Sequence, residues 1–136
     1  MRRSDQRRAA VVAVYQHDLT GRPLEETLGR DASPFARALA GAAVDRAAEL
    51  DAVIDRHAHG WAVQRIQPLE RGIMRVALIE MLHPDAVPRE EPIPAEGAIE
   101  EAVESAKTFC GSEAPGFVNG VLAAVLREVR ENARIS

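Results

Sequence analysis

The stretch PLERGIMRVALIEMLH, residues 68–83, carries apolar side chains on nearly every side when it is wound as a helix. These side chains are Leu69, Ile73, Met74, Val76, Ala77, Leu78, Ile79, Met81 and Leu82. A helix without a polar face is normally buried, because only the interior of a domain removes such a surface from water. Gln67-Pro68 gives a start signal, since proline is favoured at the first helical position. We therefore expect a central helix against which both halves of the chain pack.

The segments on both sides of this stretch also predict helices, because their apolar residues recur at helical spacing. We expect helices over 4–19, 24–29 and 34–57 before it, a helical turn over 62–66, and helices over 95–109 and from Pro115 onward after it. Ser4 and Ser33 are the expected N-caps of the helices that they open, since a serine oxygen accepts a hydrogen bond from a free backbone N–H. Residues 83–95 contain four of the eight prolines and predict an extended crossover. The predicted fold class is all-α.

Composition and length agree with a helical domain. The chain has 136 residues, of which 46% are hydrophobic but only 4% aromatic. Such a length predicts one domain, or two tightly joined sub-bundles. Gly60-Trp61 ends the first half. We therefore expect a single domain over 1–136, with sub-bundles over about 1–60 and about 61–136.

The sequence lacks the segments that direct a chain into a membrane or out of the cell. No stretch approaches the ~18–20 apolar residues of a membrane span. The N-terminus MRRSDQRRAA is charged, but no apolar region with a small-residue cleavage site follows it, as a secretory signal requires. A lone cysteine, Cys110, excludes an internal disulfide and fits a reducing compartment. We expect a cytoplasmic protein.

The residue types that carry catalysis do not gather into a recognisable site. The four histidines are His17, His57, His59 and His83. Neither an HExxH motif nor a cysteine pair accompanies them, so we expect no metal. Glycines do not cluster between a strand and a helix, as a nucleotide-binding loop requires, so we expect no cofactor. The sequence therefore predicts that the protein is not an enzyme.

The distribution of charge indicates a contact with phosphate. The net charge is −4, yet residues 1–8 hold four arginines against the single Asp5. The arginines are Arg2, Arg3, Arg7 and Arg8. A basic tip on an acidic body favours a local, directed contact with a phosphate backbone. The alternative is a solvated N-terminus without a function.

Three further features suggest binding surfaces. Glu80 falls on the apolar stripe of the central helix, where a carboxylate must be paired or must reach the surface. Phe109 and Phe117 flank a short loop and offer faces on which unstacked bases could lie, although either ring could belong to the core. Gly120 lies inside the expected last helix, where glycine costs up to ~1 kcal/mol relative to alanine. Gly120 is therefore expected to permit a close backbone approach.

Four strings in this order resemble the NusB family of transcription antitermination factors. They are the arginine-rich opening with AVYQ (13–16), LERGIMRVALIEM (69–81), AIEEAVESAKTF (98–109) and FVNGVL (117–122). The resemblance runs over nearly the whole chain. It implies an all-α fold of two packed three-helix bundles. Glu100 stands where the family usually has asparagine, and Ile79 stands where it has tyrosine before the central glutamate.

The resemblance also implies a function and its residues. The family binds boxA-type single-stranded RNA together with NusE, a small-subunit ribosomal protein, and so promotes read-through by RNA polymerase, notably in ribosomal RNA operons. Other Nus factors and the polymerase would be indirect partners. The RNA-binding positions that match are Arg2, Arg3, Arg7, Arg8, Lys107, Phe109 and Phe117. The positions that match the NusE-binding surface are Tyr15, Glu80 and Glu113.

Two alternatives remain at this point. A similar helical domain occurs in RNA cytosine methyltransferases, where it precedes a large catalytic domain, so the chain could be a fragment of such an enzyme. No glycine-rich cofactor motif accompanies it here. The other alternative is a structural homodimer that uses the Ala/Val-rich faces. Some members of the family are thought to dimerise in a way that hides the RNA-binding face, so a homodimer and an RNA-binding factor are compatible.

Overall fold

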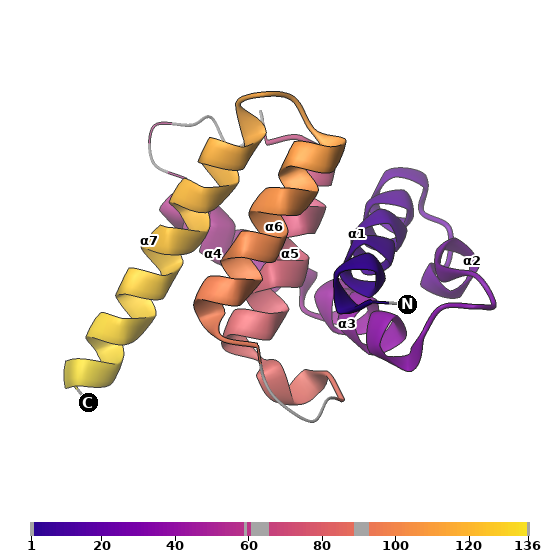
Figure 1. The fold of residues 1–136 in the computed structure, drawn as a ribbon, viewed down its shortest axis with the longest axis horizontal. Coiled ribbons are helices and arrows are strands. Elements are labelled where there is room, and N and C mark those ends of the chain that lie inside the picture. Colours follow the sequence, from indigo (N-terminus) through magenta and orange to yellow (C-terminus); the bar gives the residue numbers. More distant parts are fainter. Residues whose placement is uncertain (1, 59, 61–65, 89–92, 136) are drawn as a thin grey trace.

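The computed structural model describes residues 2–58, 60, 66–88 and 93–135, and every regular element in these ranges is helical (Figure 1). The elements are α1 (Arg3–Thr20), α2 (Leu24–Leu28), α3 (Pro34–Asp45), α4 (Ala47–His57), α5 (Pro68–Leu82), the 3-10 turn η2 (Pro84–Ala86), α6 (Ala95–Phe109) and α7 (Ala114–Ile135). The predicted all-α class is confirmed. The expected helical turn over 62–66 lies outside the described residues, except for Ile66. Among the described helices, none has the length and apolarity to cross a membrane.

Helix α5 lies at the centre of the molecule, as its sequence predicts. It contacts α1 and α3 on one side and α4, α6 and α7 on the other, and Figure 1 shows it between the two groups. Helices α1–α3 form one bundle. Helices α5–α7 form the second, with α4 packed against α5 and α7. The fold is therefore two packed helical bundles that share one core.

The expected single helix over 34–57 is wrong, because the chain breaks at Arg46. This residue has φ −106° and ψ 18° and separates α3 from α4. No glycine or proline marks the break, so its cause is packing. Helix α3 packs mainly on α1 and α5, whereas α4 packs on α5 and α7. The sub-bundle boundary near residue 60 stays a prediction, and the position of α4 favours a boundary at Arg46.

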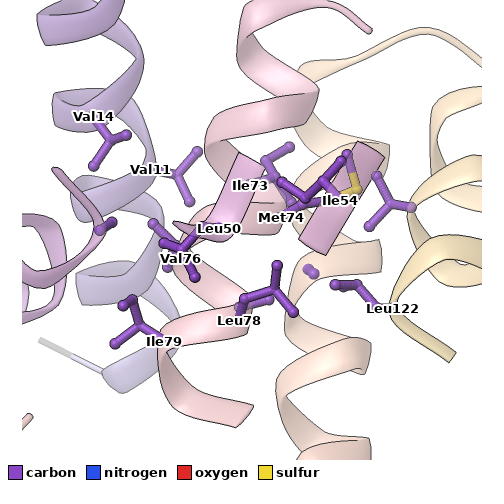
Figure 2. Packing of buried hydrophobic residues seen from close by; sticks show 14 of the residues in the cluster. Val11, Val14, Leu50, Ile54, Ile73, Met74, Val76, Leu78, Ile79 and Leu122 are labelled. Carbon is purple, nitrogen blue, oxygen red and sulfur yellow. The ribbon is translucent and has the colours of Figure 1, made fainter. Parts of the chain in front are cut away.

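One continuous apolar core joins the two bundles. Figure 2 shows side chains of α1, α4 and α7 meeting those of α5. Val11 and Val14 come from α1, Leu50 and Ile54 from α4, Ile73, Met74, Val76, Leu78 and Ile79 from α5, and Leu122 from α7. All of these side chains are buried. Since burying a large aliphatic side chain contributes about 1.5–3 kcal/mol, this cluster is the main source of stability.

Helix α5 also carries charged side chains, which form ion pairs with neighbouring helices. Arg75 is buried and donates hydrogen bonds of 2.8 and 2.7 Å to Asp51 of α4. Asp18 of α1 lies 3.5 Å away from the same guanidinium, and Arg71 lies 3.2 Å from Asp51 and 3.3 Å from Asp55. Partial burial would raise the pKa of Asp51, but the hydrogen bonds and charges of Arg75 and Arg71 outweigh burial and lower it. The description of α5 as lacking a polar face is therefore wrong.

The predicted helix ends are confirmed in part. Ser33 caps α3, since its Oγ accepts from the N–H of Ala36 at 3.0 Å. Ser4 does not cap α1, which begins one residue earlier at Arg3. The hydroxyl of Ser4 instead donates to Glu101 of α6 at 2.9 Å, because α6 lies close enough to offer a stronger acceptor.

The connections after α5 and α6 also differ from expectation in detail. The predicted extended crossover over 83–95 is wrong at Pro84–Ala86, which form a 3-10 turn. This turn is short enough for proline at its first position. Residues 89–92 lie outside the described residues. The helix over 95–109 is confirmed, and the last helix begins at Ala114, one residue before the expected start.

Candidate nucleic-acid interface

Arg2 is the N-cap residue of α1, and Arg3, Arg7 and Arg8 lie in its first two turns. We call these four arginines the basic tip. These turns pack against the start of α3, the end of α5 and the first half of α6. Arg2 is well exposed, with 83% of its side chain accessible to solvent. Asp5 lies 3.6 Å from Arg2 and 3.8 Å from Arg8. Such exposed pairs contribute at most about 1 kcal/mol, so Arg2 and Arg8 can exchange Asp5 for phosphate at little cost.

Arg7 differs from the rest of the basic tip, because it is paired inside the molecule. Its guanidinium donates to both carboxylate oxygens of Glu80, at 2.7 and 3.1 Å. Only 10% of the Arg7 side chain and 1% of the Glu80 side chain are exposed. Glu101 lies 3.8 Å from the same guanidinium. Glu80 is therefore paired inside the protein and does not reach the surface.

This pairing joins two residues that the sequence assigns to different surfaces. Arg7 matches a position for RNA and Glu80 a position for the protein partner, and both assignments stay predictions. In the folded protein, the Arg7 side chain is only 10% exposed and that of Glu80 only 1%. The pair fixes α1 on α5, and removing one member of such a buried pair typically costs about 3–5 kcal/mol.

Arg3 lies over the ring of Phe35, a residue of the apolar core. Its guanidinium carbon is 4.2 Å from the centroid of the Phe35 ring, and that of Arg7 is 5.4 Å from the same centroid. Phe35 is buried at the start of α3. Arg3 also donates to Oε1 of Gln6 at 2.7 Å. Sequence reasoning missed both residues. No local pattern shows that Phe35 faces the basic tip, whereas the i, i+3 spacing of Arg3 and Gln6 could have indicated their contact.

The predicted RNA-binding residues of α6 and α7 differ in accessibility. Lys107 is exposed and lies 3.2 Å from Glu104. Phe109 is 37% exposed, whereas Phe117 is 6% exposed and belongs to the core cluster. A base can therefore reach the ring of Phe109, but not the ring of Phe117 in this conformation. Along α6, Phe109 lies eight positions, or about 12 Å, from Glu101, which is the residue of this helix beside Arg7.

The residues predicted to bind the protein partner are spread over the molecule. Tyr15 is half-buried in α1, two turns after Arg7. Glu113 is exposed just before α7. Glu80 is buried, as described above. The structure thus leaves Tyr15 and Glu113, but not Glu80, within reach of another protein.

The close backbone approach expected at Gly120 is wrong for the described residues. A Cβ atom placed on Gly120 would meet no atom of theirs within 4 Å. Gly120 is exposed on α7, so its lack of a side chain is not required by packing within this part of the chain.

Both ring nitrogens of His57 lie within hydrogen-bond distance of other groups of the protein. Its Nδ1 lies 2.8 Å from the carbonyl oxygen of Val53, and its Nε2 lies 2.8 Å from Glu128. The hydrogen bonds and charges of His57, and then of Arg56, lower the pKa of Glu128. The described residues contain no group of histidine, cysteine and acidic side chains that could hold a metal, and His59 lies outside them.

Comparison with known proteins identifies relatives of nearly the same length. Residues 4–127 match the family model described as the NusB family. A transcription antitermination protein NusB from Rubrobacter xylanophilus is 40% identical over 90% of this chain and 88% of its own length. A protein of the same name from Bacillus mycoides is 37% identical over 92% of this chain and 97% of its own length.

Solved structures give the same result. The chain matches T. maritima NusB with a TM-score of 0.80 and 27% identity, over 94% of this chain and 92% of that one. It also matches a chain in a crystal structure of the antitermination factors NusB and NusE in complex with double-stranded RNA. That match has a TM-score of 0.74 and 26% identity, over 94% of this chain and 99% of the other.

Proposed function

The chain belongs to the NusB family, and we propose that it is a transcription antitermination factor that binds boxA-type RNA together with NusE. The observation that carries this function is the 40% identity to a NusB protein over 90% of the chain. The action is expected in the cytoplasm, where RNA polymerase and the nascent transcript are found. RNA polymerase and other Nus factors would be reached through the complex rather than directly.

The basic tip is the proposed phosphate-binding surface. Arg2, Arg3 and Arg8 keep exposed surface beside the weakly bound Asp5. Arginine suits this role, because its planar guanidinium donates two parallel hydrogen bonds to one phosphate. On α6, Lys107 supplies a further cation and Phe109 a ring for stacking on an unpaired base.

The role of NusE follows from the charge of the surface around the basic tip. Asp5 lies beside Arg2 and Arg8, and Glu104 lies beside Lys107, which are cations that would meet RNA. Glu101 adds a negative charge beside the buried Arg7. This acidic surrounding weakens the attraction of the isolated chain for phosphate. A second protein that covers part of this acidic surface, or adds cations of its own, would strengthen RNA binding. Tyr15 and Glu113 are the proposed contacts for NusE. A homodimer stays a separate prediction.

Fluorescence titration of a boxA-type RNA, with and without NusE and over a salt series, tests the proposal. We expect tighter binding with NusE than with either protein alone. We also expect the logarithm of the affinity to fall linearly with that of the salt concentration, with a slope set by the phosphates contacted. A scrambled RNA of the same length is the control. If NusE left the affinity unchanged and the scrambled RNA bound equally well, the antitermination function would be rejected.

The methyltransferase alternative receives no support from the comparisons. The relatives described above are named as antitermination proteins, and this chain spans 88% and 97% of their lengths. No observation in the described residues favours a role as part of a larger enzyme. We therefore propose only the antitermination function.

A further inference from the structure

Arg3 is exposed, yet its guanidinium is held from two directions. The Phe35 ring lies under it at 4.2 Å, and Gln6 accepts one of its N–H groups at 2.7 Å. For Arg2, its neighbour in sequence, the contact given by the described residues is the half-exposed Asp5 at 3.6 Å. Two adjacent arginines of the basic tip therefore differ in how firmly they are placed.

The support for Arg3 begins at the start of α3. Ser33 caps this helix, and its hydroxyl oxygen accepts from Ala36. The same hydroxyl donates to Oε1 of Gln6 at 2.9 Å. Gln6 Oε1 thus accepts from both Ser33 and Arg3, which connects the cap of α3 to the guanidinium.

The orientation of the Phe35 ring is fixed by the core. Phe35 is 2% exposed and belongs to the buried cluster, so its ring cannot turn without disturbing the packing of α3 on α1. A guanidinium that rests on an aromatic ring keeps the N–H donors at its edge available for other acceptors. Gln6 uses one donor of Arg3, and the remaining donors can be offered to a ligand.

We propose that Phe35, Gln6 and Ser33 are positioning residues that hold Arg3 ready to bind a phosphate of the RNA. This inference rests on the proposed function, because it takes the basic tip to be the RNA-binding surface. An arginine that is already ordered loses less side-chain entropy on binding than a free one. Arg3 should therefore contribute more to affinity than Arg2, although both are exposed.

A double-mutant cycle between Arg3 and Gln6 tests the inference, with boxA-type RNA bound in the presence of NusE. We expect Arg3→Ala to weaken binding about tenfold and to reduce the salt slope by about one, through loss of one phosphate contact. Gln6→Ala should weaken binding about threefold with an unchanged slope, because the contact remains but is no longer prearranged. In the Arg3→Ala background, Gln6→Ala should have no further effect.

Matched variants separate positioning from folding. Gln16→Ala makes the same change at an exposed position of the same helix and should leave binding unchanged. Phe35→Leu keeps an apolar core residue but removes the ring, and its thermal unfolding is measured beside its binding. If Phe35→Leu does not fold, the double-mutant cycle between Arg3 and Gln6 still tests the positioning role.

The outcomes distinguish the inference from the function on which it rests. Additive effects of Arg3→Ala and Gln6→Ala, or an equal loss from Gln16→Ala, would overturn the positioning role while the protein still binds RNA. Wild-type protein that fails to bind boxA-type RNA with NusE would overturn the proposed function itself.

Discussion

Two buried arginines, Arg7 and Arg75, hold α1 in place from opposite ends, but in different surroundings. Arg75 of α5 binds Asp51 of α4 and lies 3.5 Å from Asp18, near the end of α1. Arg7, near the start of α1, binds Glu80 of α5. Both ion pairs cross between helices inside the protein. Only the second lies beside exposed cations.

The difference shows that the same chemistry can have two consequences. At the Arg75 end, two acids from two helices surround one arginine, and the effect is to fix α4 and α1 on α5. At the Arg7 end, the pair also fixes the two turns that carry Arg2, Arg3 and Arg8. Loss of the first pair should therefore affect stability alone, and loss of the second should affect stability and RNA binding together.

The largest effect is expected for Asp51→Ala. This change removes both hydrogen bonds from Asp51 to the buried Arg75 and the ion pair of Asp51 with Arg71 at once. Although Asp18 stays 3.5 Å from Arg75, the free energy of unfolding should therefore fall by about 3–5 kcal/mol. Urea unfolding followed by circular dichroism measures it. Asp45→Ala, at an exposed end of α3, is the control and should change stability by less than about 0.5 kcal/mol. RNA affinity of the folded Asp51→Ala protein should equal that of wild type, and a large loss would contradict the comparison.

A smaller loss of stability is expected for Glu80→Ala. Glu101 remains 3.8 Å from Arg7 and partly replaces the missing carboxylate, so we expect about 2–3 kcal/mol. Here RNA binding with NusE should weaken as well, measured at a temperature where the variant is fully folded. Glu131→Ala, at an exposed position of α7, controls for loss of a negative charge. Unchanged RNA binding by folded Glu80→Ala would show that the basic tip does not depend on this pair.

The smallest effect is expected in the dependence of stability on acidic pH. The pKa of Asp51 is lower in the folded protein than its ordinary value of 3.8, so the unfolded chain takes up a proton first as pH falls. The stabilisation is therefore complete above the ordinary value and is lost as pH falls through the lowered, folded value. Urea unfolding from about pH 6 to about pH 3 should show a shallower loss in Asp51→Asn than in wild type. If stability fell equally with pH in both proteins, Asp51 would not contribute to the loss of stability in acid.

The helices could be predicted because their signals are local. The apolar spacing of residues 95–109 and the Ser33-Pro34 start signal each lie within a few turns of chain, and the structure has both. The break at Arg46 has no local signal, since neither glycine nor proline lies near it. Only the different partners of α3 and α4 explain the break.

The candidate site could be predicted as a set of residue types, but not as an arrangement. The four arginines and Glu80 stand out in the sequence, and the pairing of Asp5 with Arg2 and Arg8 follows from their spacing of three. The partners that lie far along the chain cannot be read from it. Phe35 gives no sign of lying under Arg3, because the two residues are 32 positions apart and belong to different helices. Glu101 has the same difficulty, since it meets Ser4 across 97 positions.

The sequence by itself determined the all-α class, the burial of α5 and the presence of a basic N-terminus, because apolar periodicity, capping and charge are properties of neighbouring residues. The tertiary structure alone decided that Arg7 is closed off by Glu80, that Arg3 rests on Phe35 and that Arg2 stays open to solvent. These outcomes depend on how helices pack, and Arg7 and Glu80 are 73 positions apart. Burial and charge pairing are set by such distant contacts, and so is the choice of which arginines can meet a phosphate.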